Sequence, residues 1–501
     1  NLEALWHKPD LLPRTEPLYR LPYFHIPMRQ ACSLALLSHV ATALFHVPLQ
    51  IQRVAPEESS LVQKTAANPW TNKNGNTHAT GYSPSVALRN LEDGPAWGFE
   101  ADPEGLGIVP HLHQIWATPI IDADQNIIVQ AGDGEIHKFT RDGVELWQTQ
   151  TFIMGANIPA LMDNVLYTVA ADGIFRAFNA STGAAVWEKK IGDDGAFNDA
   201  RSVLAANGML FTSYGNAQTT DYSGGTGAPS VVAVNASDGS LMWRWDGHTV
   251  MNFIAGFHED SILFVDDAGT MYRLRAIDGS VVWKQSPEIS ADLWWFGTGG
   301  VALDMDGNVY ATHNYKTFDN PGPGVVTARR FSDGGLLWSR RLSVDANAAP
   351  AVATLDGVNG GPLAVFVGLG QNPNTGPSDP RELFWQDGVA MALSATTGET
   401  LWEHTFPPWF GEGRNDRDDT PGYNCFSDSF GNPAVDGNGT AYFLRADGYV
   451  YAIHDDNHDG KIASEEVSSY DLESPFQSSP AISGGMLAVT PCRGLRVFLR
   501  S

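Results

Sequence analysis

The sequence predicts an all-β fold, an eight-bladed β-propeller, from three observations. A glycine turn followed four residues later by tryptophan recurs along the chain, and short β-rich runs precede each turn. The 51 glycines and 15 tryptophans among 501 residues are also typical of a repeat architecture. The repeated pairs are Gly143–Trp147, Gly183–Trp187, Gly239–Trp243, Gly279–Trp283, Gly334–Trp338 and Gly398–Trp402.

The turns of the repeat predict tight hairpins. Asp-Gly or Thr-Gly between alternating apolar runs places the glycine at a positive φ, and the tryptophan then takes a fixed position on the following strand. Further strands precede each turn, as in "IPALMDNVLYTVAADGIFRAFNASTG" at residues 158–183. Four strands per unit, at a period of roughly 40 to 60 residues, indicate propeller blades.

Two further units complete the count of eight. Residues 431–460, "GNPAVDGNGTAYFLRADGYVYAIHDDNHDG", contain the first three strands of a blade. Residues 478–501 contain three more strands, and the missing fourth strand is predicted around Trp97 in "LEDGPAWGFEAD". Pairing the two ends of the chain in this way closes the ring and removes exposed sheet edges.

The turn of the seventh unit, "DDNHDGKIASEE" at residues 455–466, predicts an EF-hand-like calcium loop. Oxygen ligands stand at positions one, three, five, seven and twelve, and Gly460 provides the sharp turn at position six. Ala463 at position nine has no ligand side chain, so a water would complete the set. We expect a structural calcium ion that stabilises an enlarged outer hairpin; the alternative is a hydrated acidic turn of accidental spacing. The predicted ligands are Asp455, Asn457, Asp459, Lys461 through its carbonyl, and Glu466.

Charge and cysteine content exclude several classes of protein. The chain carries 31 Lys and Arg against 57 Asp and Glu, a formal net charge of −26. Because this field repels polyanions, we expect no nucleic-acid partner. Three cysteines exclude a disulfide-dense scaffold and a metal site built from several cysteines.

Residues 1–66 predict an N-terminal arm that precedes the propeller of residues 67–501. The arm begins with the proline-rich, aperiodic stretch "LLPRTEPLYRLPYFHIP". Residues 30–52 then carry no formal charge, lie between Arg29 and Arg53, and are numerous enough to span a bilayer. Three interpretations stay open: a single membrane helix, a helix docked on a partner protein, and an uncleaved signal-like segment.

Long insertions predict a ligand or partner face. They occupy residues 214–230, 313–324, 369–388 and 406–429, on connections that share one side of a propeller. Long loops on a rigid scaffold commonly carry binding residues, although their aromatic side chains also pack within a loop or against a neighbouring blade. The candidates are Tyr214, Tyr222, Trp294, Trp295, Tyr315, Trp385, Trp409 and Arg414.

Cys425 and Cys492 are predicted on this same face, in adjacent blades. A disulfide between them would indicate an oxidising compartment, and therefore a secreted, periplasmic or organelle-lumenal protein. Two free buried thiols are the alternative.

The repeat "A-x-(D/N)-x-x-(T/D)-G-x-x-x-W", together with "NPWTNKNGNTHATGYSPS" at residues 68–85, resembles the pyrroloquinoline quinone (PQQ) type propeller family. The resemblance covers residues 68–501 and implies the fold. The family includes PQQ-dependent alcohol dehydrogenases and non-catalytic members, among them a propeller lipoprotein of bacterial outer-membrane assembly. Its dehydrogenases carry adjacent cysteines beside the cofactor, and no such pair occurs here.

Three hypotheses for function follow. The preferred one is a non-enzymatic, calcium-stabilised scaffold whose N-terminal arm ties it to a membrane or to other protein subunits. The second is a quinoprotein alcohol dehydrogenase with PQQ on the loop-rich face. The third is a carbohydrate-binding propeller that uses the exposed aromatic residues.

Overall fold

The computed structural model describes residues 68–101, 115, 117–132, 134–151, 157–170, 172–191, 201–214, 230–247, 250, 253–266, 268–287, 294–296, 300–317, 320–370, 385–410 and 429–500. The chain divides between Val62 and Gln63, and all of these residues belong to the second unit. The predicted arm, with its segment 30–52, lies outside them. Within the described ranges, no helix has the length and hydropathy needed to cross a membrane.

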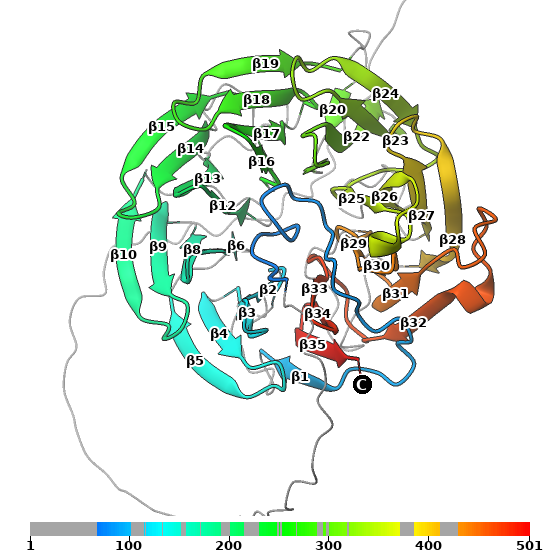
Figure 1. The fold of residues 1–501 in the computed structure, drawn as a ribbon, viewed down its shortest axis with the longest axis horizontal. Coiled ribbons are helices and arrows are strands. Elements are labelled where there is room, and N and C mark those ends of the chain that lie inside the picture. Colours follow the sequence, from blue (N-terminus) through cyan, green and yellow to red (C-terminus); the bar gives the residue numbers. More distant parts are fainter. Residues whose placement is uncertain are drawn as a thin grey trace, which may run out of the picture. The chain divides into compact units, whose positions relative to one another are not determined.

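Eight antiparallel sheets form a ring, which confirms the predicted β-propeller (Figure 1). In blades 1 to 7 the strands follow one another in sequence from the inner to the outer side of the ring. Blade 1 contains β2 (Ile120–Ile121), β3 (Ile127–Gln130), β4 (Glu135–Phe139) and β5 (Glu145–Gln150); blade 2 contains β7 (Ala160–Met162), β8 (Val165–Val169), β9 (Ile174–Asn179) and β10 (Ala185–Lys190). Blade 3 contains β12 (Leu204–Ala206), β13 (Met209–Tyr214), β14 (Ser230–Asn235) and β15 (Leu241–Asp246); blade 4 contains β16 (Gly256–His258), β17 (Ser261–Val265), β18 (Met271–Arg275) and β19 (Val281–Gln285).

The second half of the ring repeats this plan, with an added strand in blade 5. Blade 5 contains β21 (Val301–Leu303), β22 (Val309–Thr317), β23 (Asn320–Arg329) and β24 (Leu336–Arg341), and β20 (Trp294–Phe296) also pairs with β22. Blade 6 contains β25 (Ala351–Thr354), β26 (Leu363–Gly370), β27 (Trp385–Ser394) and β28 (Thr400–Phe410), with the 3-10 helix η1 (Gly357–Asn359) in its first turn. Blade 7 contains β29 (Ala434–Val435), β30 (Ala441–Leu444), β31 (Tyr449–Ile453) and β32 (Val467–Asp471), with the 3-10 helix η3 (Ser464–Glu466) before β32. A short parallel pair, β6 (Asn157–Ile158) and β11 (Arg201–Ser202), lies outside the blades.

Blade 8 closes the ring with strands from both ends of the described chain. It contains β33 (Ala481–Ser483), β34 (Met486–Val489) and β35 (Gly494–Leu499), and β1 (Trp97–Glu100) pairs antiparallel with β35. Trp97 lies opposite Val497 and Glu100 opposite Gly494. The predicted closure by the strand around Trp97 is therefore confirmed.

The repeated tryptophans join each blade to the next one. Trp338 on β24 donates its indole N–H to the carbonyl of Ala395 in blade 6, at 2.7 Å. Its ring lies so close to Gly398 that a Cβ added there would approach it to 2.6 Å, and Gly398 has a φ of +74°. The glycine is thus required both for the turn and for the close approach of the ring. The same arrangement recurs for the pairs Trp97–Gly143, Trp147–Gly183, Trp187–Gly239, Trp243–Gly279 and Trp283–Gly334.

Residues 70–83, which we call the central segment, run along the inner strands of the ring (Figure 1). Hydrogen bonds between its backbone or side-chain oxygens and inner-strand N–H groups follow the order of the blades from 1 to 7. The inner-strand donors are Ile121, Leu161, Ala205, Phe257, Leu303, Val352 and Val435. Trp70, at the start of the segment, is buried with 1% of its surface exposed. A single stretch of chain therefore fixes the relative position of seven blades.

The insertion at residues 313–324, predicted as a loop, is an extension of a hairpin. Strand β22 continues to Thr317, β23 begins at Asn320, and Lys316 lies opposite Pro321. In blade 6, Trp409 similarly lies on β28, opposite Gln386. Pairing between the strands satisfies backbone N–H and C=O groups that would have to bind water in an irregular loop. This explains why the ends of these hairpins continue as strands.

Candidate functional site

The predicted calcium loop lies at the outer side of the ring, between β31 and β32 of blade 7. Asp455 is buried at 4% exposure, and its two carboxylate oxygens accept the N–H groups of Asp459 (3.2 Å) and Gly460 (2.9 Å). Asn457 accepts a second bond from the N–H of Asp459 at 2.9 Å. Asp459 accepts from the N–H of Lys461 at 2.8 Å. Side-chain oxygens of the predicted ligands therefore hold the backbone of residues 455–461 in a tight turn.

Glu466, the predicted twelfth-position ligand, closes the loop from its other end. It is buried at 3% exposure, and its carboxylate accepts the N–H groups of Asp456 and Ala463, each at 2.8 Å. Gly460 takes the positive φ of +77° that the sequence pattern requires at the sharp turn. The structure therefore brings the first and last predicted ligands into one closed loop.

The charges of these two carboxylates are not balanced by a basic side chain. Among the described residues, neither Asp455 nor Glu466 has an ion-pair partner, and the hydrogen bonds that their carboxylates accept come from backbone N–H groups. A buried carboxylate is costly unless it is paired or coordinates a metal. In the part of the chain that the structure describes, no three His, Cys, Asp or Glu side chains converge as a preformed metal cluster.

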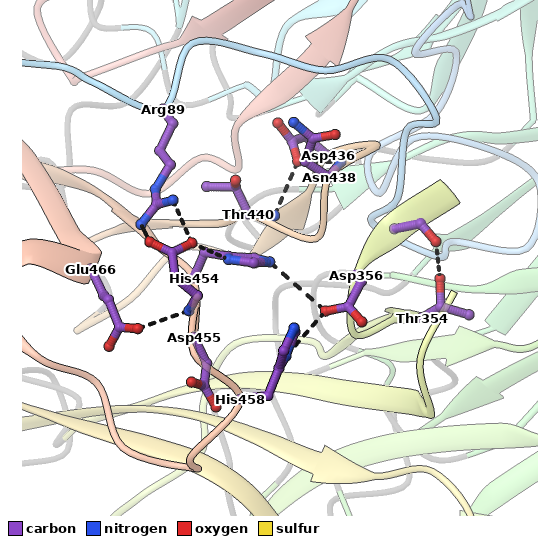
Figure 2. A network of polar contacts seen from close by, with 12 residues as sticks. Arg89, Thr354, Asp356, Asp436, Asn438, Thr440, His454, Asp455, His458 and Glu466 are labelled. Carbon is purple, nitrogen blue, oxygen red and sulfur yellow. Dashed lines mark hydrogen bonds and ion pairs between the residues drawn. The ribbon is translucent and has the colours of Figure 1, made fainter. Parts of the chain in front are cut away.

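The loop contacts two other parts of the ring: the segment that contains Arg89, which Figure 2 shows, and blade 6. Arg89, which follows the central segment, binds Asp456 through two bonds of 2.6 Å. This bond to the guanidinium, and a second from His454, hold the pKa of Asp456 below its usual value. On the side of blade 6, the backbones of Lys461 and Glu403 form an isolated parallel β-bridge, and a Cβ on Gly460 would lie 2.9 Å from the carbonyl oxygen of Leu401.

A polar cavity of about 370 Å³ lies beside the loop. His454 and Asp456 line it from the loop, Arg89 from the preceding segment and Arg500 from the end of the chain. Asp436 lies on its wall, where burial raises the pKa of the carboxyl although four groups donate hydrogen bonds to it.

The aromatic candidates that the structure describes lie on strands of three different blades. Trp295 on β20 lies opposite Tyr315 on β22, and Trp294 lies opposite Lys316. Trp385 and Trp409 lie on β27 and β28 of blade 6, and Tyr214 ends β13 of blade 3. The described contacts do not bring these three blades together into one site. Tyr222 and Arg414 lie outside the described residues.

Cys492 occupies the predicted connection between β34 and β35, is buried at 2% exposure, and is disulfide-bonded. Its partner lies outside the described residues, as do Cys32 and Cys425. The pairing of Cys425 with Cys492 therefore stays a prediction.

Asp356, which faces the loop from the first turn of blade 6, was not predicted from the sequence. Its Oδ1 lies 4.0 Å from Nε2 of His454 and 3.6 Å from Nδ1 of His458 (Figure 2). The spacing of four residues between His454 and His458 was visible in the sequence. Asp356, about a hundred residues earlier, gives no local signal.

The fold and the repeat are those of a β-propeller with PQQ-type repeats, as predicted. The family model described as "Outer membrane protein assembly factor BamB" matches residues 85–228 and 227–293. The chain is 27% identical over 149 residues to a tetrathionate hydrolase of Acidianus ambivalens, covering 28% of this chain and 23% of the relative. It is 23% identical over 134 residues to BamB of Legionella pneumophila (strain Paris), covering 27% and 33%.

Solved structures show the same fold at low identity. The crystal structure of the quinohemoprotein alcohol dehydrogenase from Comamonas testosteroni superimposes with a TM-score of 0.58 at 12% identity, covering 87% of this chain and 78% of that one. The matched stretches span a third or less of the curated relatives. The comparisons thus establish the repeat and the fold.

Proposed function

We propose that this protein is a non-enzymatic propeller scaffold that binds other protein subunits through the outer strands of its blades. The observation that carries the proposal is a series of exposed aliphatic side chains just before the repeated tryptophans, on successive blades. These residues are Val144 (62% exposed), Leu146 (49%), Val186 (53%), Leu241 (50%), Val281 (47%), Leu336 (44%) and Leu337 (40%).

The position of these side chains supports docking of a protein. They lie on or directly before β5, β10, β15, β19 and β24, each of which pairs with a single neighbour among the strands that the structure describes. Exposed apolar residues repeated on neighbouring outer strands provide apolar contacts for a partner, and an unpaired strand edge offers backbone donors and acceptors to an incoming chain. A relative named as an outer membrane assembly factor is consistent with a scaffold of this kind.

Calcium stabilisation is the second part of the proposal. It is supported by the two buried carboxylates without a basic partner, Asp455 and Glu466, and by the curled backbone between them. The oxygen-only donor set fits a hard cation such as calcium. A bound ion would neutralise both carboxylates and hold the loop against blade 6.

The arm of residues 1–66 supplies the third part, a tether to a membrane or to a larger assembly. The disulfide-bonded Cys492 supports a compartment outside the cytosol, because disulfides persist where thiols are oxidised. Deletion of residues 1–66 is expected to release the propeller from the membrane or from its complex, as measured by cell fractionation. Unchanged fractionation would contradict the tether.

The scaffold proposal is tested by identifying what co-purifies with the native protein. We expect discrete partner subunits that are lost when Leu336 and Leu337 are both changed to Glu and kept in the control Met305→Glu. Met305 is a matched control because it is 80% exposed but lies in the turn between β21 and β22. A chain that purifies alone, or partners that survive Leu336→Glu/Leu337→Glu, would overturn the proposal.

The fold shared with an alcohol dehydrogenase favours one alternative, a PQQ-dependent enzyme. Addition of PQQ, calcium and an alcohol, followed by reduction of an artificial electron acceptor, would establish that alternative and remove the non-enzymatic part of the proposal.

A further inference from the structure

We propose that His454, His458 and Asp356 bind a divalent transition-metal ion, with Zn²⁺ as the representative, between blades 6 and 7. This site would be distinct from the calcium loop's interior, since none of its ligands belongs to the predicted calcium set. Asp356 stands in the turn after β25, while both histidines belong to the segment after β31. Figure 2 shows the two imidazole rings directed towards the same carboxylate.

The distances around Asp356 leave room for an ion. Its Oδ1 is buried and accepts no hydrogen bond from any residue that the structure describes. The two nearest imidazole nitrogens lie at 3.6 Å (His458 Nδ1) and 4.0 Å (His454 Nε2), which are too long for hydrogen bonds. A cation between this buried carboxylate oxygen and the two imidazole nitrogens would give each of the three atoms a partner.

The orientation of His454 is fixed from its other nitrogen. Its Nδ1 lies 2.8 Å from Oδ1 of Asp456, a carboxylate that Arg89 holds by two bonds and that can only accept. Nδ1 therefore donates, and in the neutral ring Nε2 presents its lone pair to Asp356. Metal-binding histidines usually donate their second nitrogen to a carboxylate in this manner, so that the first nitrogen is aimed at the ion.

The spacing fits a transition metal after a small contraction. With metal–ligand bonds of about 2.0–2.2 Å, tetrahedral ligands lie about 3.3–3.6 Å apart. The shorter gap of 3.6 Å is already at this limit, and the longer gap of 4.0 Å exceeds it. No closed three-residue cluster exists in the described part of the chain, so the site is not preformed. His458 lies on a loop with its side chain 56% exposed, so a rotation of this side chain towards the ion would close the gap.

The ligand chemistry selects the class of ion. Two imidazoles and one carboxylate suit Zn²⁺ and its neighbours, whereas Ca²⁺ takes oxygen ligands. A bound ion would connect the first turn of blade 6 to the outer loop of blade 7. The competing interpretation is a shared proton, which would make His454 a cation paired with Asp356 without any metal.

The test is calorimetric titration of the whole protein with ZnCl₂ at neutral pH and saturating calcium. We expect one zinc per chain, and at least tenfold weaker binding for His458→Asn and for Asp356→Asn. His458 is exposed and has a φ of +57°, which asparagine tolerates, so this variant keeps its fold. Glu465→Gln is the matched control, because it removes a charge from the same loop without facing Asp356.

Two further readouts separate the proposal from its alternatives. Co²⁺ should give visible absorption bands of a nitrogen- and oxygen-ligated site, and these should be absent in His458→Asn. Zinc binding should persist in Glu466→Gln, which removes a predicted calcium ligand. Absence of zinc binding, equal affinity in all variants, or loss of binding only in Glu466→Gln would overturn the inference.

Discussion

The contact between a tryptophan and the glycine of the next blade should contribute measurably to the stability of the ring, and Gly398→Ala tests this. Gly398 has a φ of +74°, and an added Cβ would lie 2.6 Å from the ring of Trp338. Gly208 is the matched control, because its φ is +73° and no atom of the described residues lies within 4 Å of an added Cβ. Both substitutions carry the same backbone penalty, so their difference isolates the interblade contact.

The magnitude follows from the geometry at Trp338. The left-handed backbone costs alanine roughly 1–2 kcal/mol at either position. At Gly398 the ring must also retreat, which lengthens the 2.7 Å bond from its indole N–H to Ala395 and removes about 1 kcal/mol. Overpacking of this buried contact adds about 1–3 kcal/mol. We therefore expect Gly398→Ala to be destabilised by about 2–4 kcal/mol more than Gly208→Ala.

The assay is urea denaturation followed by intrinsic tryptophan fluorescence, with midpoints compared at constant slope. The slope must be checked, because a large propeller is not guaranteed to unfold in one step. Equal midpoints for the two alanine variants would refute the argument that the glycine is required by the neighbouring ring. A lower midpoint for Gly208→Ala would refute it as well.

Two further predictions concern the calcium loop and the central segment. Calcium should raise the unfolding temperature of the wild type and of Glu465→Gln but not of Glu466→Gln. At a calcium concentration one hundred times the Kd, the free energy of unfolding should rise by about 2.7 kcal/mol. An equal rise in all three proteins would exclude the loop as the calcium site. Burial, and then the neighbouring His258, lower the pKa of His78 below 6.5. As the pH falls, His78 therefore takes up a proton at a higher pH in the unfolded chain than in the folded protein. The free energy of unfolding should then decrease as the pH falls below 6.5, and the contribution of neutral His78, which is present above pH 6.5, should be lost. Urea midpoints from pH 7.5 to 5.5 should therefore fall less steeply for His78→Gln, whereas parallel pH profiles would contradict this.

The blades could be predicted from the sequence because their signal is local. The Gly398 turn and Trp402 lie four residues apart, so a hairpin and an outer strand can be recognised in a single window of sequence. Ring closure could also be predicted, since one blade lacked a strand and the region of Trp97 supplied one. These inferences needed only periodicity and a count.

The contacts of the central segment could not be predicted because they are made largely by its backbone. Thr77 and Gly81 offer carbonyl oxygens to Phe257 and Val435, and a carbonyl has no sequence signature. The position of Asp356 was missed for a related reason: its neighbours His454 and His458 come from the next blade. Such pairs are fixed by the closed ring and not by local sequence.

The junction between blades 6 and 7 differs from the others in how it is held. At five successive junctions, from blade 1 to blade 6, a tryptophan packs on a glycine turn, but Trp402 of blade 6 meets a segment in which the turn has become a loop of charged residues. Gly460 of that loop still approaches the backbone at Leu401, so the close contact is kept while the packing changes. Arg89, which precedes the closing strand β1 in the sequence, binds Asp456 of blade 7. Ion sites at this junction would therefore act where, between blades 1 and 7, the contact of a tryptophan with a glycine turn is replaced by a loop of charged residues.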